Sequence, residues 1–158
     1  MTGTGVRGRS AGSDQSERRV RAAVARKIVG GFYLSMGGVH LGIVMSNPEV
    51  YRPFASGAYF AFVRSGWTDI FMAYPRAWGM ALVVGETLVG VALLVGGTWA
   101  KLGWVGVIAF HVALMLFGFG VWLWSIPVLA VLVPLARADW SQLSASAHHA
   151  STRDRCTD

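Results

Sequence analysis

Apolar residues gather in four long runs along the chain, and polar residues lie in the segments between and beside those runs. The clearest run covers residues 77–97 and contains a single charged residue, Glu86, near its middle. As a helix this run is roughly 31 Å long, which matches the hydrocarbon core of a bilayer. It therefore predicts a membrane span that carries one carboxyl group inside it.

The remaining runs predict three further spans, at about residues 28–45, 102–118 and 121–136. The last two come from one stretch without Asp, Glu, Lys or Arg that is too long for a single span, so the chain must fold back within it. Two glycines beside a tryptophan cluster indicate a turn near residues 118–122. The pattern as a whole predicts an all-α fold, a four-transmembrane-helix bundle.

The connection at residues 46–76 differs from the short links between the other spans. It holds three prolines and eight aromatic residues, but no segment long and apolar enough to cross a bilayer. Aromatic and arginine side chains favour the headgroup layer. We expect an interfacial, partly helical outer loop after the first span, with a lid over the mouth of the bundle as the alternative.

The two ends of the chain are polar. Residues 1–25 are rich in Gly, Ser and Arg and offer little apolar surface to offset the entropy of ordering, so we predict a disordered basic cytoplasmic tail. Residues 26–136 then form the four-helix membrane domain, and residues 137–158 form a polar C-terminal tail.

Composition and charge support this division. The chain is 54% hydrophobic and only 14% charged, against about 25% charged in soluble domains. The net charge of +6 indicates membrane orientation and no nucleic-acid partner, because seven of the fourteen basic residues precede the first span. We expect a multi-pass protein of the cytoplasmic (inner or plasma) membrane with both termini in the cytoplasm. The single cysteine excludes an internal disulfide, and no metal site is predicted.

Three ionisable side chains fall inside predicted spans: His40, Glu86 and His111. Counted from the cytoplasmic ends, they lie roughly 18, 16 and 14 Å along their helices, at nearly one depth. Ionisable groups are costly in a bilayer and usually face the interior of a bundle. We therefore predict that the three form a ligand- or proton-binding site near the bilayer midplane, with no catalytic residue assigned. Simple hydrogen bonding between helices is the alternative role for each of them.

Small residues indicate where the helices pack. Gly38 and Gly42 are four residues apart on the first span, and Gly79 and Gly90 share a face of the second span with Glu86. We predict that these four glycines are helix-packing positions and that Glu86 points into the bundle. The same small-residue faces would also allow a homo-oligomer.

The second span reads G-E-T-L-V-G-V-A-L-L-V-G-G, after a basic lead, a glycine-rich first span and an aromatic outer loop. This arrangement resembles the DoxX-like family of small four-helix integral membrane proteins, and Glu86 and Gly90 match the family's Glu followed by Gly. The resemblance covers about residues 25–136, while the long loop with three prolines departs from the family and His40 and His111 match no family motif. It implies a cytoplasmic-membrane subunit, linked in some members to a quinone-dependent oxidoreductase.

These observations favour a membrane subunit associated with quinone-linked redox chemistry, in which Glu86 with His40 or His111 contacts a quinone head group or its proton. The chain has no nucleotide motif and no cysteine pair, so a partner redox protein would supply the electrons, and any enzyme would be an oxidoreductase of which this chain is one subunit. A haem between the two histidines is a less favoured hypothesis. The alternative is a non-enzymatic scaffold in the lipid bilayer, or a small-solute or proton-coupled carrier.

Overall fold

A computed structural model of the chain describes the backbone of residues 7–154 and the side chains of residues 14–144. The described residues are almost entirely helical and contain no strand, so the all-α prediction is confirmed. The short elements η1 (Pro48–Ala55) and η3 (Met115–Phe117) are 3₁₀ helices, and η2 (Gly66–Phe71) is a π-helical segment. The elements follow in the order α1 (Arg7–Ser46), η1 (Pro48–Ala55), α2 (Ala61–Ser65), η2 (Gly66–Phe71), α3 (Pro75–Val95), α4 (Gly97–Leu114), η3 (Met115–Phe117) and α5 (Phe119–Asp154).

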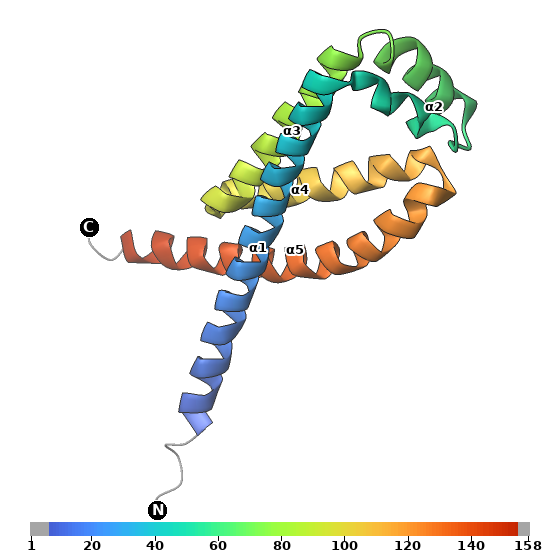
Figure 1. The fold of residues 1–158 in the computed structure, drawn as a ribbon. Helices are drawn as coiled ribbons and strands as arrows, with labels where there is room; N and C mark the ends of the chain where they lie inside the picture. The colour runs from blue at the N-terminus through green and yellow to red at the C-terminus, as the bar shows by residue number, and fades with distance from the viewer. Residues whose placement is uncertain (1–6, 155–158) are drawn as a thin grey trace, which may run out of the picture.

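Four helices of the described chain are long and apolar enough to cross a membrane, and they coincide with the four runs in the sequence. Figure 1 shows α1 beside α3, α4 doubling back into α5, and the outer segment around α2 at one end of the molecule. By length and composition the protein is therefore a multi-pass, four-helix membrane protein. The four candidate spans are Asp14–Ser46, Pro75–Val95, Gly97–Phe117 and Phe119–Ser144.

The main core lies between the four long helices. Glycines let α4 approach α3 closely, since a Cβ on Gly103 would come within 2.8 Å of Leu93 and one on Gly106 within 2.8 Å of Val89. Trp104 is only 1% exposed at the centre of this contact. The core cluster consists of Tyr33, Leu93, Trp104, Val107, Leu132 and Ala136.

The crossing of α1 and α3 is equally close because glycines face each other across it. A Cβ on Gly30 would lie 3.0 Å from the Gly90 carbonyl oxygen, and one on Gly90 would lie 2.9 Å from the Gly30 oxygen. Further along α1, a Cβ on Gly37 would lie 3.7 Å from the Cβ of Glu86. Backbones approach to this degree only where side chains are missing. The crossing thus brings the middle of α1 against Glu86.

The predicted packing glycines divide into two pairs. Gly79 and Gly90 are buried against α1, and a Cβ on Gly79 would collide with the side chain of Val44. Gly38 and Gly42 are exposed, and a Cβ on either would meet no described atom within 4 Å. Within one chain these two therefore do not take the predicted packing role, because small residues lie on two faces of α1 and the face that meets α3 is the one that carries Gly30 and Gly37.

The turn between α4 and α5 lies at Gly118, where the outer segment meets it. Gly118 has a φ of +98°, and a Cβ there would collide with the carbonyl oxygen of Gly57. Both the backbone conformation and the lack of space require glycine at this position. The outer segment is also tied to the end of α1 by a buried cluster of Val44, Tyr51 and Met72.

The helices extend into both predicted tails. Helix α1 begins at Arg7, so the described part of the segment expected to be disordered, residues 7–25, is helical, and α5 continues through the polar tail to Asp154. Two contacts support the helix here: Arg21 pairs with Glu17 one turn earlier at 3.2 Å, and Gln142 of α5 donates a hydrogen bond to the Arg18 carbonyl at 3.3 Å. Residues 1–6 and 155–158 lie outside the described residues.

Candidate functional site

The candidate site centres on a contact between His40 of α1 and Glu86 of α3. The His40 Nδ1 lies 2.7 Å from Glu86 Oε2, and the two side chains are 17% and 6% exposed. A nitrogen and an oxygen at this distance share one proton, whether it belongs to the imidazole or to the carboxyl group. The structure therefore brings together two of the three ionisable residues that the sequence singles out.

His111, the third predicted residue, has a different partner. Its Nδ1 lies 3.1 Å from the Tyr33 hydroxyl and 3.0 Å from the carbonyl oxygen of Val107, and both His111 and Tyr33 are buried. The three predicted residues therefore form two hydrogen-bonded pairs. Sequence reasoning missed Tyr33 because tyrosine carries no charge, although Tyr33 lies seven residues before His40 and so shares its face of α1.

Two cavities border these pairs. The outer cavity measures about 340 Å³, includes His40 in its wall and lies under η1 and η2; the inner cavity measures about 220 Å³ and includes both Tyr33 and Glu86. Leu82 and Phe110 line both of them. The rest of the outer wall is apolar or aromatic: Ile43, Val50, Tyr51, Phe54, Trp67, Ala113, Leu114 and Phe117. The His40–Glu86 pair thus has one member on each cavity.

Tyr51 of η1 adds a hydroxyl group beside this pair. Its ring centroid lies 5.9 Å from that of His40, and its main-chain carbonyl accepts a hydrogen bond from Trp67 Nε1 at 2.9 Å. The hydroxyl is buried and has no hydrogen-bond partner among the described residues. Burial, followed by the charge of Glu86, raises the pKa of the Tyr51 phenol. Tyr51 therefore stays neutral near pH 7 and keeps a donor that no described group uses.

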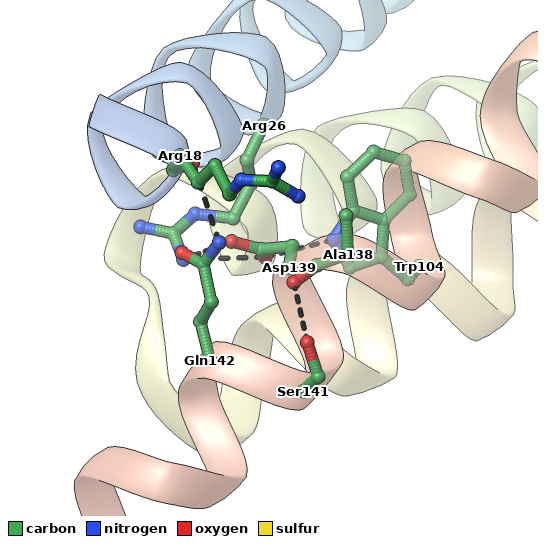
Figure 2. Close-up of polar contacts among 7 residues, drawn as sticks. All are labelled: Arg18, Arg26, Trp104, Ala138, Asp139, Ser141 and Gln142. Atoms are coloured by element: carbon green, nitrogen blue, oxygen red, sulfur yellow. Dashed lines mark hydrogen bonds and ion pairs between the residues drawn. The ribbon is translucent and has the colours of Figure 1, made fainter. Parts of the chain in front are cut away.

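A second polar cluster lies where α1 crosses α5 (Figure 1 and Figure 2). Arg26 Nη1 is 3.3 Å from both carboxylate oxygens of Asp139, and Trp104 Nε1 donates to Asp139 Oδ2 at 3.0 Å. The Arg26 and Asp139 side chains are only 12% and 3% exposed, so this is a buried ion pair. It ties together α1, α4 and α5. The sequence places Asp139 in a polar tail, and its one signal is that it is the first acidic residue after the fourth span.

The arrangement does not suit a haem between the predicted histidines. His40 lines the outer cavity, whereas His111 lines neither of the two cavities, so no shared space separates the imidazoles. In the described part of the chain no three His, Cys, Asp or Glu side chains gather as a metal-binding group. A small organic ligand with hydrogen-bonding groups fits the donor set better.

Glu86 and Gly90, the two residues on which the DoxX-like resemblance depends, lie on one face of α3 and are both buried against α1. The geometry thus gives each a clear role, one in the polar contact and the other in the close crossing. The resemblance itself remains a hypothesis. Comparison of the chain with models of known protein families, with curated proteins and with solved structures finds no match.

Proposed function

We propose that the protein is a DoxX-like membrane subunit associated with quinone-linked redox chemistry, and that its outer cavity takes the head group of a quinone-like lipid. One observation carries the proposal: His40, held by Glu86 at 2.7 Å, lines an otherwise apolar and aromatic cavity of about 340 Å³. This volume lies within the roughly 300–1,000 Å³ of ligand pockets, which combine apolar walls with few polar groups.

The cavity supplies the groups that such a head needs. With Nδ1 occupied by Glu86, the other imidazole nitrogen of His40 donates a hydrogen bond when the ring is protonated and accepts one when it is neutral. It therefore suits both a quinone carbonyl and a quinol hydroxyl. The unused hydroxyl of Tyr51 is a second donor beside His40. Phe54, Trp67 and Phe110 provide flat apolar surface for the ring and keep water out.

A bound quinone supplies two-electron, two-proton chemistry, and a partner redox protein would supply the electrons. The chain's own part is to bind the head group, orient it and move a proton. Glu86 stabilises a proton on His40, and His40 hands that proton to the ligand oxygen, after which the pair must be reprotonated. The buried position of the pair makes this exchange slow unless a further hydrogen-bonding group reaches Glu86.

We further propose that this cavity lies towards the outer face of the cytoplasmic membrane. The ends of α1, α4 and α5 that carry Arg26 and Lys101 come together, since Lys101 Nζ lies 3.0 Å from Ser144 of α5 and Arg26 pairs with Asp139. Basic residues next to spans favour the cytoplasmic side. Both termini would then be cytoplasmic, and the outer segment over the cavity would face the other compartment.

The test is purification of the full chain in mild detergent, followed by extraction of bound lipids, quantification of quinone and titration with decylubiquinone. We expect a co-purifying quinone in the unaltered protein, and at least a tenfold loss of bound quinone and of decylubiquinone affinity in Glu86→Gln. The matched control is Glu49→Gln, because Glu49 is exposed and, among the described residues, its carboxylate forms an ion pair with Arg52 in η1 alone; this variant should bind normally.

Other outcomes would contradict the proposal. A protein that is folded, carries no quinone and binds no decylubiquinone favours a scaffold or a carrier, and the same holds if Glu86→Gln binds as well as the unaltered chain. An optical spectrum of the same sample tests the haem hypothesis, because a haem would give a Soret band.

A further inference from the structure

Each of the two hydrogen-bonded pairs of the core contributes one side chain to the wall of the inner cavity. Glu86 belongs to one pair and Tyr33 to the other, and both side chains line this cavity of about 220 Å³. Gly85, which is exposed, forms part of the same wall and leaves the space open on that side, whereas Gly106 of the wall packs closely against Val89. The wall of this cavity therefore carries one polar group from each pair.

The protons at His111 decide what Tyr33 can do. The carbonyl oxygen of Val107, 3.0 Å from His111 Nδ1, can only accept a hydrogen bond, which favours the tautomer with a proton on Nδ1. In that tautomer the Tyr33 oxygen, 3.1 Å from the same nitrogen, accepts from Nδ1. The phenolic proton of Tyr33 remains free to be donated elsewhere, and among the side chains that line the inner cavity the acceptor is the Glu86 carboxylate.

We propose that the inner cavity holds water that links the Tyr33 hydroxyl to the Glu86 carboxylate, and that Tyr33, positioned by His111, is the second group after His40 that controls the proton on Glu86. The space is several times the roughly 30 Å³ that one water molecule occupies in the liquid. A water there has a donor in Tyr33 and an acceptor in Glu86, which meets the need of a buried water for at least two polar partners.

This role of Tyr33 deepens the proposed function, and it rests on that function for the step in which the proton passes to a quinone. A chain of groups then runs through the core from the ligand site: His40, Glu86, water, Tyr33 and His111. When His40 gives its proton to a ligand, Glu86 is left as a carboxylate, and the water held by Tyr33 stabilises that charge by donating a hydrogen bond to it. In this proposal the His40–Glu86 pair and the Tyr33–His111 pair belong to one hydrogen-bonded path.

The experiment follows the proton on Glu86 in the purified full-length protein without any quinone. Dicyclohexylcarbodiimide reacts with protonated carboxyl groups in apolar surroundings, so its rate of attachment to Glu86, followed by peptide mass spectrometry over a series of pH values, reports the protonated fraction. The titratable groups that face Glu86 are His40 and Tyr33 of α1, Tyr51 of η1 and, through Tyr33, His111 of α4.

We expect the labelling rate to fall as pH rises and the midpoint of that fall to lie about one pH unit higher in Tyr33→Phe. This shift is about a tenfold change in the protonated-to-ionised ratio at a fixed pH, because the variant removes a donor that favours the carboxylate while it keeps the ring. Tyr59→Phe is the matched control, since Tyr59 is exposed and lies outside both cavities; its midpoint should not move.

His111 is tested as a positioning residue. His111→Asn places an amide donor near the Nδ1 position and should keep the midpoint of the unaltered protein, whereas His111→Phe should shift the midpoint in the same direction as Tyr33→Phe. A Tyr33→Phe variant that folds and labels with the unaltered pH profile would overturn the proposal. Since the assay contains no quinone, a shifted profile together with absent quinone binding would overturn the proposed function and leave this path standing.

Discussion

Replacing Gly90 with alanine tests whether the glycine crossing of α1 and α3 holds the candidate site together. The added Cβ would lie 2.9 Å from the Gly30 carbonyl oxygen and 2.8 Å from Leu34 Cγ. The Leu34 side chain can rotate away, but the carbonyl belongs to the backbone of α1. To reach an ordinary contact of 3.4 Å, the helices must separate locally by 3.4 − 2.9 = 0.5 Å.

That separation has a cost in stability and a cost at the site. Forcing one extra carbon into a well-packed contact destabilises a protein by about 1–3 kcal/mol. Glu86 lies one turn before Gly90 on the same helix, so movement of α3 also lengthens the 2.7 Å contact with His40. We expect Gly90→Ala to unfold earlier in a thermal or detergent titration and to lose decylubiquinone affinity as well.

The control is Gly38→Ala on the other face of α1. A Cβ there meets no described atom within 4 Å, and alanine is favoured over glycine in a helix by up to about 1 kcal/mol. Gly38→Ala should therefore be as stable as the unaltered protein or more stable, so that the two Gly→Ala changes have opposite signs. Equal effects of the two variants would refute the argument that Gly90 is needed for its missing side chain.

Two further predictions concern the ends of the bundle. Asp139→Asn leaves Arg26 buried without its charged partner and should lower the free energy of unfolding by about 3 kcal/mol, measured by denaturant titration with Trp fluorescence, whereas Glu17→Gln in an exposed pair should have no measurable effect. Gly118→Ala, at a φ of +98° and against Gly57, should lower the melting temperature and make the outer segment more sensitive to protease, while Gly120→Ala, in open space, should do neither.

The number and positions of the spanning helices follow from the sequence, because the length of each predicted helix is close to the thickness of the hydrocarbon core of a bilayer. The turn between α4 and α5 was also predictable, since Gly118 stands beside a tryptophan cluster in a stretch too long for one span. The helical state of residues 7–25 was not, because composition measures apolar surface and does not include the contact that α5 offers to Arg18. Long-range partners of this kind depend on tertiary packing.

The candidate site, like the fold, was predictable from the sequence only in part. Glu86, His40 and His111 could be selected from the sequence, because ionisable groups inside apolar runs are costly and need partners. Which partner each has depends on how far each helix is rotated about its axis, which the sequence leaves open. Tyr33 illustrates this. The equal depth of His111 and Glu86 suggests that they contact each other, but the hydrogen-bond partner of His111 is Tyr33 and that of Glu86 is His40.

The His40–Glu86 and Tyr33–His111 pairs each have a structural and a chemical role open to them. Each pair gives a buried polar group its hydrogen-bond partner on another helix, and each has one member on the wall of the inner cavity. Removing a whole side chain cannot tell a packing role from a chemical one. Glu86→Gln can, because glutamine keeps the length of the side chain and still hydrogen-bonds His40, while it can neither carry the negative charge nor exchange a proton. If this variant is as stable to unfolding as the unaltered protein but no longer binds quinone, the carboxyl group acts through its charge and its proton. If both its stability and its quinone affinity fall, the pair serves to hold α1 against α3 and the chemistry must lie elsewhere.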